Sequence, residues 1–295
     1  MAGEKSTIWG DFLQPVVRLL INEAELNHSY KNIDWEQESS RYRNPQIIYP
    51  EYYTQQKFHG MVGGYLNPKN AIAYDSIAPY LLPPQETLVR QGLINHIQGT
   101  PQRILDLGCG TGTSTQMLQG RFPQASITGV DLSPYMLTIA SHKAKQKNQP
   151  AALEIHWQQG NGEHTGFPVG YFDLITASLL FHETPVLVGQ AIVKECFRLL
   201  KGGGQFIIMD HAQTVLRRVN WLQEVMEEPK ILDPSLKDYA MESLDAWLGA
   251  AGFVAVSTQD LWLVHQLTSG FKPQPIQDSW TYPGIELNDF MGGFA

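Results

Sequence analysis

The stretch ILDLGCGTG, residues 104–112, decides the fold of this 295-residue chain. It begins, together with Arg103, as a short apolar run of the kind that predicts a buried strand. Three glycines at alternate positions follow, and the residues through about Gln119 then have the character of a helix. Glycine lets the backbone turn sharply and approach a ligand that a Cβ would exclude. The stretch therefore predicts a strand, a ligand-binding loop and a helix in succession.

Short apolar runs alternate with helical patterns beyond this loop. We expect strands at 126–131, 153–158, 172–178 and 205–210, and helices at 133–146 and 186–200, the latter ended by three glycines at 202–204. Helices at 215–226 and 237–250 then precede strands at 253–258 and 261–267, close enough to pair antiparallel. This order is typical of βαβ units. It predicts an α/β fold with a Rossmann-like doubly wound sheet, mostly parallel, and an antiparallel C-terminal strand pair.

The residues before the glycine loop differ in composition and pattern from those after it. A helix is expected at 12–24, an aromatic segment at 49–80 is interrupted by turn-forming Gly and Pro, and a helix is expected at 85–97. We expect a helical and aromatic N-terminal cap or lid at 1–84, a core at 85–270 and an irregular, proline-rich arm at 271–295.

The loop and the next strand together indicate the ligand. Asp131 ends that strand, at about the distance from the loop where an acid binds ribose hydroxyls in Rossmann-type sites. Thr113 stands where the nicotinamide pattern GxGxxG has its third glycine. Asp106, at the end of the first strand, suits an ammonium group better than a pyrophosphate. These features favour a nucleoside that carries an amino acid over a dinucleotide, and they keep a nicotinamide-dependent oxidoreductase as the second alternative.

The glycine stretch resembles motif I of the class I S-adenosylmethionine-dependent methyltransferases, in the form DxGxGxG. The resemblance extends over about residues 70–267 and is greatest to the ubiquinone/menaquinone-biosynthesis-like (type 11) subgroup. It includes GVDLS at 129–133, GNG at 160–162, FDLI at 172–175 and LLKGGG at 199–204. Two positions depart from the family: Asn161 stands where Asp is usual, and Gly202 where Pro is usual.

The resemblance implies S-adenosyl-L-methionine as cofactor and assigns roles to matching residues. Asp106 and the loop would hold the methionine part, Asp131 the ribose, and Asn161 the adenine amino group. Leu132 and Met136 would lie against the adenine, Ser178 near the methionine end, and Tyr74 would close over the cofactor. Cys109 is interpreted as a small residue packed beside the cofactor and not as a nucleophile. The full set of expected cofactor-binding residues is Tyr74, Asp106, Gly108, Cys109, Gly110, Gly112, Asp131, Leu132, Met136, Asn161, Gly162 and Ser178.

The acceptor side is less explicit in the sequence. His182 lies at the carboxyl end of the fourth expected strand, where open parallel sheets bind ligands, and it is the candidate general base. A purely structural role for His182 is an equal alternative, and His59 and His211 are weaker candidates. We expect His59, Tyr65 and Trp221 to line the acceptor space. A wall with many aromatic side chains and few charges suits a phenol, a quinone ring or an indole.

Composition excludes several classes of protein. The chain carries 21 Lys+Arg against 29 Asp+Glu, a net charge of −8, and contains no run of basic residues, which argues against nucleic-acid binding. The two cysteines, Cys109 and Cys196, are far apart and form no zinc or disulfide motif. No metal site is expected. The longest uncharged apolar run, 174–181, is too short to span a membrane, and the N-terminus lacks a signal-peptide pattern.

The sequence thus predicts a cytoplasmic enzyme that methylates a small, aromatic or apolar molecule. The alternatives are the nicotinamide oxidoreductase and a catalytically silent cofactor-binding protein. The identity of the acceptor, the atom that receives the methyl group and the oligomeric state are left open.

Overall fold

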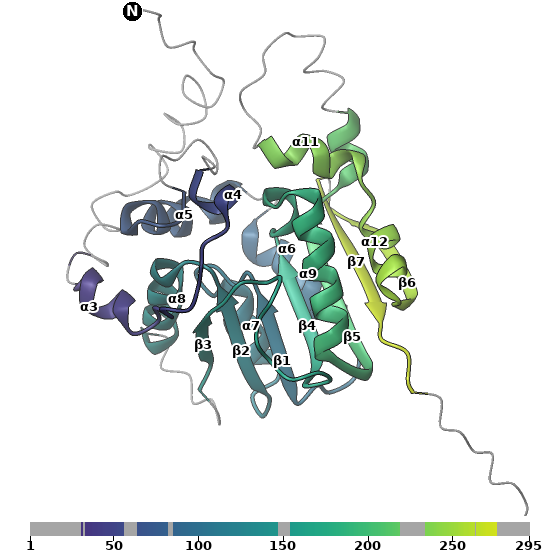
Figure 1. Cartoon of the computed structure of the whole chain (residues 1–295), viewed down its shortest axis with the longest axis horizontal. Coiled ribbons are helices and arrows are strands. Elements are labelled where there is room, and N and C mark those ends of the chain that lie inside the picture. Colours follow the sequence, from purple (N-terminus) through teal and green to yellow (C-terminus); the bar gives the residue numbers. More distant parts are fainter. Residues whose placement is uncertain are drawn as a thin grey trace, which may run out of the picture.

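A twisted sheet of seven strands lies at the centre of the computed structural model, with helices on both of its faces (Figure 1). The structure describes residues 31, 33–55, 64–81, 85–146, 154–218, 234–262 and 264–275. The strand order is β3-β2-β1-β4-β5-β7-β6, in which only β7 and β6 pair antiparallel to their neighbours. The predicted Rossmann-like sheet, with its antiparallel C-terminal pair, is confirmed. Its strands are β1 (Arg103–Leu107), β2 (Ser126–Asp131), β3 (His156–Gln159), β4 (Phe172–Ser178), β5 (Leu200–His211), β6 (Val254–Leu261) and β7 (His265–Phe271).

The helices fall into a group before the sheet and a group between its strands. Before β1 lie α3 (Trp35–Ser40), α4 (Glu51–Gln55), α5 (Pro68–Leu81) and α6 (Glu86–Asn95). Within the sheet region follow α7 (Thr113–Arg121), α8 (Pro134–Gln146), the 3-10 turn η3 (Phe181–Glu183), α9 (Val186–Leu199), α11 (Pro234–Met241) and α12 (Leu244–Ala251). Residues 213–218 are also helical, whereas the rest of the expected helix 215–226 and the whole of 12–24 lie outside the described residues.

The two faces of the sheet bury separate apolar cores, as the alternation of side chains along each strand requires. One face packs against α9 and α12, with Leu105, Ile175 and Phe206 in its centre. The opposite face packs against α6 and α7, with Ile104 and Ile207 in its centre. Because consecutive residues of β1 point to opposite faces, Asp106 points to the same side as Ile104, toward α7. This parity determines where the acid at the end of β1 lies.

The region around β5 differs from the expectation that three glycines end the preceding helix. The strand already starts at Leu200, so the glycines at 202–204 lie inside it. Gly203 has φ +79°, a conformation that residues with a Cβ rarely adopt, and its N–H donates to the carbonyl of Lys272. The pairing with β4 shifts register between Phe172 and Leu174. The glycines thus permit an irregular strand and not a helix terminus.

The expected helix 237–250 is wrong in one respect, because the structure divides it into α11 and α12. Ser243 lies between them in an extended conformation. The Arg217 side chain donates to the carbonyls of Ala240 and Glu242, and Gln213 accepts from the N–H of Leu244. These long-range contacts satisfy backbone groups that a continuous helix would have satisfied internally. The expected strands 253–258 and 261–267 are also displaced, because β6 continues to Leu261 and β7 begins at His265. Trp262, just after β6, has φ +57°.

The N-terminal cap, here residues 33–55 and 64–81, packs on α8 and on the end of β2. α3 and α5 both contact α8, and α5 also contacts α6. Tyr53, Tyr65 and Ala71 of the cap form a buried cluster with Met136 and Ile139 of α8. The aromatic segment of the sequence therefore forms part of a core, at the edge of the sheet where the glycine loop lies.

Gln159 ties the cap to the sheet by hydrogen bonds. Its side chain is buried at the end of β3, accepts from the N–H of Asn44, and donates to the Tyr49 hydroxyl and the Leu132 carbonyl. Arg43 adds a hydrogen bond to the Tyr135 hydroxyl at the surface. One amide thus connects two cap residues with the loop after β2.

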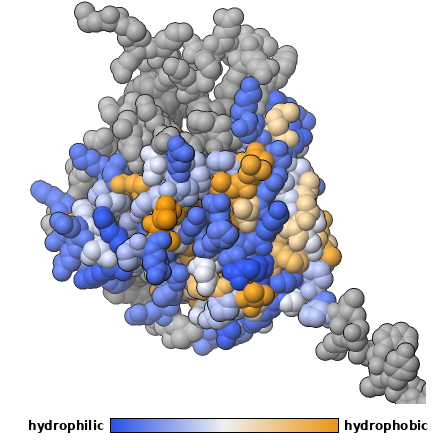
Figure 2. Space-filling view, viewed as in Figure 1, coloured by the Kyte–Doolittle hydropathy of each residue, from blue (hydrophilic) through white to orange (hydrophobic). Residues whose placement is uncertain are grey.

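The described surface gives no sign of a broad apolar area on the face shown in Figure 2, where hydrophobic residues form small groups among hydrophilic ones. The most exposed large apolar side chains are Ile48, Leu187, Met241 and Val169. None of the helices in the described part of the chain has the length and apolar character needed to cross a bilayer.

The role of Gln159 leads to a prediction about the cap. Gln159→Leu keeps the size of the side chain but leaves the Asn44 N–H and the Leu132 carbonyl without their buried partner, at a cost of about 1–3 kcal/mol. We expect faster hydrogen exchange in residues 44–55 and unchanged exchange in β1 and β4, measured by mass spectrometry. Gln91→Leu is the control, because the Gln91 amide bonds Asn95 on the same helix. Equal exchange in the two variants would contradict the anchoring role.

Candidate functional site

The glycine loop after β1 has the geometry for which glycine is needed. Gly108, Gly110 and Gly112 all have positive φ, at +67°, +52° and +77°. A Cβ on Gly108 would lie 2.9 Å from Leu180, and one on Gly112 2.7 Å from Trp157. A Cβ on Gly110, in contrast, would meet no described atom closer than Tyr74 Cε1 at 4.0 Å. The space over Gly110 is therefore open to a ligand.

Asp131 at the end of β2 faces this loop. Its Oδ2 accepts from the N–H of Gly110 at 2.9 Å and its Oδ1 accepts from the N–H of Ser133 at 2.8 Å. Burial raises the pKa of Asp131 to about 6, although the backbone hydrogen bonds from Ser133 and Gly110 oppose this rise. Each carboxylate oxygen accepts one backbone bond and keeps a further lone pair. The carboxylate can therefore accept from a pair of ribose hydroxyls as well.

Asp106 is buried at the end of β1 and is bonded inside the protein. Thr115 of α7 and Thr176 of β4 donate their hydroxyls to it at 2.6 and 2.7 Å. Burial raises the pKa of Asp106, and the two hydroxyl hydrogen bonds counteract part of that effect. With 1% of its surface exposed, Asp106 supports the loop from beneath. Its expected contact with the methionine part of the cofactor stays a prediction.

A buried arginine that sequence reasoning missed lies beside the loop. Arg90 of α6 pairs with Glu86 through Nε at 2.8 Å and donates through an NH group to the Ser114 hydroxyl at 2.6 Å. Ser114 in turn donates to Ser178 at 3.2 Å. Burial would lower the pKa of Arg90, but Tyr74 and Glu86 raise it above its usual value. A fixed positive charge thus lies beside the first turn of α7.

The expected adenine-binding residues lie at the ends of β2 and β3. Asn161 accepts the N–H of Glu163 through Oδ1 at 2.9 Å, which leaves that oxygen one lone pair for an amino group. Met136 is buried in the cluster that the cap forms on α8, and Leu132 packs against that cluster. A Cβ on Gly162 would be 3.3 Å from Ile192. Gly162 therefore has a packing role, and its contact with the cofactor stays a prediction.

Two cap tyrosines cover the loop. Tyr74 and Tyr65 pack edge to face with ring centroids 5.7 Å apart. Tyr74 is the side chain nearest to the open space over Gly110, and the carbonyl of Tyr65 accepts from the Ser133 hydroxyl at 2.6 Å. Burial raises the pKa of both phenols, so both remain uncharged at neutral pH. The cap thus reaches the loop and the end of β2.

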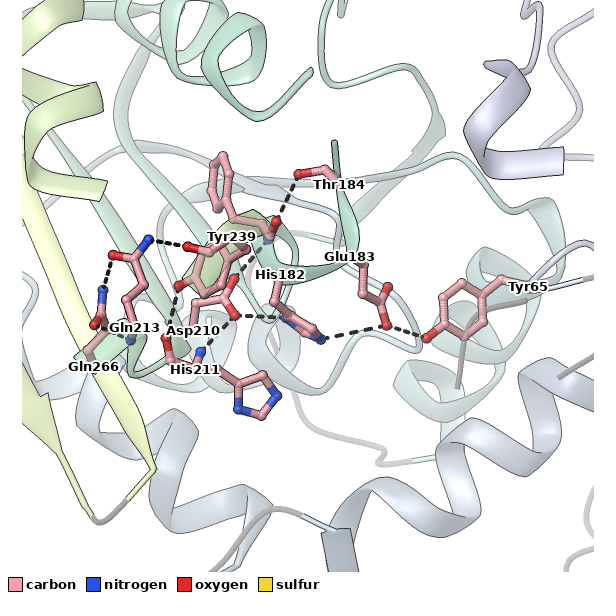
Figure 3. A network of polar contacts seen from close by, with 10 residues as sticks. Tyr65, His182, Glu183, Thr184, Asp210, His211, Gln213, Tyr239 and Gln266 are labelled. Atoms are coloured by element: carbon pink, nitrogen blue, oxygen red, sulfur yellow. Dashed lines mark hydrogen bonds and ion pairs between the residues drawn. The ribbon is translucent and has the colours of Figure 1, made fainter. Parts of the chain in front are cut away.

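His182 follows β4 and forms a buried pair with Asp210 of β5 (Figure 3). The His182 Nδ1 lies 2.8 Å from Asp210 Oδ1, and both side chains are nearly inaccessible to water. Asp210 also accepts the N–H groups of Phe181 and His211. Burial alone would raise the pKa of Asp210, but His182 and these hydrogen bonds bring it below its usual value. The ionised Asp210 therefore holds the Nδ1 proton of His182.

Glu183 continues this network toward the cap, as Figure 3 shows. Its Oε1 lies 3.8 Å from His182 Nε2 and accepts the Tyr65 hydroxyl at 2.7 Å. Tyr65, which we expected to line the acceptor space, is thus joined to the candidate base through one carboxylate. The other two expected acceptor residues, His59 and Trp221, lie outside the described residues.

Two further histidines pack behind His182. The His211 ring lies edge to face with the His182 ring at 4.5 Å and parallel to the His265 ring at 5.3 Å. Burial lowers the pKa of His265 to about 4, and its ring nitrogens have no hydrogen-bond partner in the structure. Across the ranges that the structure describes, no group of His, Cys, Asp and Glu side chains is arranged to hold a metal ion.

The described residues fit S-adenosylmethionine as a ligand. The open space over Gly110 accommodates close approach, Asp131 has lone pairs for the ribose, and Arg90 is a fixed cation suited to a carboxylate. The sequence contains no motif that identifies Arg90 or Asp210 as site residues, because each is brought to the site by folding alone. The sequence indicated only that Arg90 lies in a helix and that Asp210 lies at the carboxyl end of the fifth strand.

Comparisons with known proteins agree with this geometry. A family model described as a methyltransferase domain matches residues 104–204. A demethylmenaquinone methyltransferase of Lactococcus lactis is 31% identical over 174 residues, which cover 53% of this chain and 67% of the relative. Another, of Thermus thermophilus, is 32% identical over 114 residues, which cover 39% of this chain and 49% of the relative. The chain thus spans about half the length of one of these relatives and two thirds of the other.

Solved structures support the fold. A phosphoethanolamine N-methyltransferase 2 of Haemonchus contortus, determined in complex with S-adenosyl-L-methionine, superposes with a TM-score of 0.55 over 79% of this chain and 62% of that protein. The sequences are 13% identical, so this similarity concerns the fold.

Asp131 generates a prediction about pH. Below about pH 6 the Asp131 carboxyl is protonated and loses acceptor capacity. We therefore expect the affinity for S-adenosylhomocysteine to rise as the pH increases from 5 to 7, measured by calorimetry. Asp131→Ala should weaken binding by at least about 2 kcal/mol at pH 7.5 and remove this pH dependence. An affinity that is independent of pH in the unmodified chain, or unchanged in the variant, would remove the ribose role.

The glycine loop generates a second prediction, which compares neighbouring positions. Gly110→Ala places a methyl group in open space, so we expect a folded protein that has lost measurable affinity for S-adenosylhomocysteine. Gly112→Ala places its Cβ 2.7 Å from Trp157, so we expect a lower melting temperature. Both variants share the strain of a positive φ, about 1–2 kcal/mol. Normal binding by Gly110→Ala would mean that the loop does not cradle the cofactor.

Proposed function

Because this chain belongs to the class I S-adenosylmethionine-dependent methyltransferases, we propose that it transfers the methyl group of that cofactor to a small molecule with an acidic hydroxyl on an aromatic or otherwise apolar frame. The observation that carries this proposal is the buried His182–Asp210 pair at the carboxyl edge of the sheet, beside the loop after β4. Family membership overturns the alternative of a nicotinamide-dependent oxidoreductase.

The cofactor would be held by residues at three strand ends, of α6 and of the cap. Asp131 would accept from the ribose, Asn161 from the adenine amino group, and Arg90 would attract the carboxylate of the methionine part. Gly110 would allow the close approach, and Tyr74 would cover the ligand. When bound, the cofactor supplies a methyl group on a sulfonium, which is electrophilic enough to be transferred directly to a nucleophile.

His182 would act as the general base. Its Nδ1 proton is donated to the ionised Asp210, so a neutral ring carries its lone pair on Nε2. That nitrogen can take the proton of an acceptor hydroxyl as the oxygen becomes a nucleophile, a contribution of typically about 10²–10⁴-fold in rate. Asp210 keeps the ring in the required tautomer and stabilises the imidazolium that forms.

The side chains that are proposed to line the acceptor space indicate which class of acceptor it suits. Tyr65 from the cap and His182 from the loop after β4 provide aromatic surface, and His59 and Trp221 are proposed to extend it. Tyr52 of the cap lies within the electrostatic influence of Glu163, Glu183 and Asp131, so the surroundings carry several negative charges. Such a site disfavours an anionic acceptor and suits an uncharged aromatic one. Among the acceptors expected from the sequence, a phenol or the hydroquinone form of a quinone ring carries the hydroxyl that this proposal requires, whereas an indole does not.

The cap, which the sequence divides from the core at residue 84, is proposed to be the cover of this site. It contacts α8, the end of β2 and Glu183, all at the carboxyl edge of the sheet. A cover there excludes water from the cationic sulfonium and orients the acceptor.

The direct experiment is a screen with S-adenosylmethionine labelled in its methyl group. Phenols, prenylated hydroquinones, indoles and amines are incubated with the protein, and labelled products are identified by mass spectrometry. We expect labelled phenolic or hydroquinone products and none from a matched benzoate series. Binding of S-adenosylhomocysteine without any methylated product would instead favour the catalytically silent cofactor-binding protein.

Asp210 supplies the prediction for the reaction. Asp210→Asn retains the size of the side chain but removes the charge that holds the Nδ1 proton of His182. We expect kcat to fall about 10²-fold or more with little change in the affinity for S-adenosylhomocysteine. The loss should be smaller for acceptors whose hydroxyl is more acidic, because they need the base less. An equal loss for all acceptors would indicate a structural role for the pair.

A further inference from the structure

His182 has a carboxylate on each side. Asp210 Oδ1 lies 2.8 Å from Nδ1, and Glu183 Oε1 lies 3.8 Å from Nε2 (Figure 3). The two acids differ in exposure: the Asp210 side chain is fully buried, whereas 13% of the Glu183 side chain is exposed. Only Glu183 can therefore exchange a proton with water directly.

The two acids also differ in what they face. Asp210 occupies the nitrogen that keeps its proton, whereas Glu183 faces Nε2, the nitrogen that would receive a proton from an acceptor. A separation of 3.8 Å is too short for a hydroxyl oxygen to lie on the line between Nε2 and this carboxylate, since each contact would need about 2.7–3.0 Å. A hydroxyl that donates its proton to Nε2 from beside that line would place its oxygen against an ionised carboxylate, which can only accept hydrogen bonds and repels it. An acceptor hydroxyl and the Glu183 carboxylate therefore compete for the same position.

The cap holds Glu183 in this position. The Tyr65 hydroxyl donates to Glu183 Oε1 at 2.7 Å, and the Tyr65 carbonyl accepts from the Ser133 hydroxyl, two residues after Asp131. The same cap residue thus touches the expected ribose site and the carboxylate beside the base. Tyr65 is also packed on Tyr74, which lies over the glycine loop.

We infer that Glu183 is a positioning residue of the base, which occupies the acceptor's place beside His182 Nε2 until the oxygen of a hydroxyl-bearing acceptor displaces it. The inference rests on the proposed function. It adds a specificity determinant: the acceptor must present an oxygen able to replace a carboxylate at an imidazole nitrogen. An unactivated carbon cannot do so.

In this proposal the His182 ring is doubly protonated while Glu183 is in place, and the two carboxylates balance its charge. When the acceptor displaces Glu183, the Nε2 proton passes to that carboxylate and on to water, which leaves the neutral ring with its lone pair on Nε2. The acceptor O–H bond then breaks and its proton moves to Nε2. The oxygen's electron pair forms the bond to the methyl carbon as the C–S bond breaks, and the electrons of that bond remain on sulfur. Glu183 returns when the product leaves.

The titration of His182 depends on all groups that surround it. They come from four elements of the fold, and the carboxylates are the only anions among them in the described residues. The surrounding titratable groups are Glu183 of η3, Asp210 and His211 of β5, His265 of β7 and Tyr65 of the cap.

The first test is an NMR titration of the full chain with isotopically labelled histidine. Glu183→Gln removes the charge but keeps an oxygen that can accept from Tyr65. We expect the His182 titration midpoint to move to lower pH by about one pH unit. Glu163→Gln is the control for a nearby lost charge and should leave the midpoint unchanged. A midpoint in Glu183→Gln equal to that of the unmodified chain would overturn the inference.

The second test measures displacement with 4-nitrophenol, whose colour reports the phenolate. We expect it to bind the complex with S-adenosylhomocysteine severalfold more tightly in Glu183→Gln, and also in Tyr65→Phe, which keeps the carboxylate but releases it from the cap. Equal or weaker binding in Glu183→Gln would show that the carboxylate and the acceptor do not share a position. Failure of the proposed function would be recognised separately, as absent S-adenosylhomocysteine binding or absent methyl transfer by the unmodified chain.

Discussion

Three carboxylates are taken wholly or partly out of water where the strands end, and each must receive hydrogen-bond donors. Asp106 and Asp210 are buried near the ends of β1 and β5, and Asp131 is partly buried at the end of β2. A buried charge without partners costs far more than one hydrogen bond contributes. The donors come from distant segments: two threonines for Asp106, the glycine loop for Asp131 and His182 for Asp210. Satisfying these acids brings α7, the loop and the turn after β4 to one edge of the sheet.

The cap meets the same edge mostly through neutral groups. Gln159 and Ser133 bond backbone groups of the cap, and the tyrosines Tyr53 and Tyr65 fill the space above α8. Two contacts of the cap involve charges. Asp75 of α5 forms an ion pair with Lys143 of α8, and Glu183 connects the cap to the catalytic histidine proposed here. In that proposal, opening the cap and freeing the base are linked through Glu183.

Some glycines of the loop are required by packing within the protein, whereas another leaves space for a ligand. At Gly108 and Gly112 a Cβ would strike side chains of the protein, so these glycines are explained by the fold. At Gly110 the space is open, and the backbone N–H donates to Asp131. At that position no described atom of the protein would exclude a side chain, as the proposed cofactor contact requires, although the positive φ of Gly110 also favours glycine. A similar contrast distinguishes Asp106 from Asp131. Each accepts one hydrogen bond on each carboxylate oxygen, but Asp106 is 1% exposed whereas Asp131 is only partly buried and can be reached by a ligand.

The sequence alone determined the sheet, because the short apolar runs and the glycine stretch are local signals. The spacing of Asp131 from the loop indicated a nucleoside ligand, and the family resemblance of the motifs specified S-adenosylmethionine. Tertiary structure decided the rest. The break between α11 and α12 depends on Arg217 and Gln213, and the start of β5 at Leu200 depends on the pairing of Leu200 with Phe172 of β4. Arg90, Asp210 and Glu183 carry no motif, since their roles arise from burial and from partners 24 to 118 residues away along the chain. Local pattern reports what one segment prefers, whereas the electrostatic environment of a side chain exists only after distant segments have packed around it.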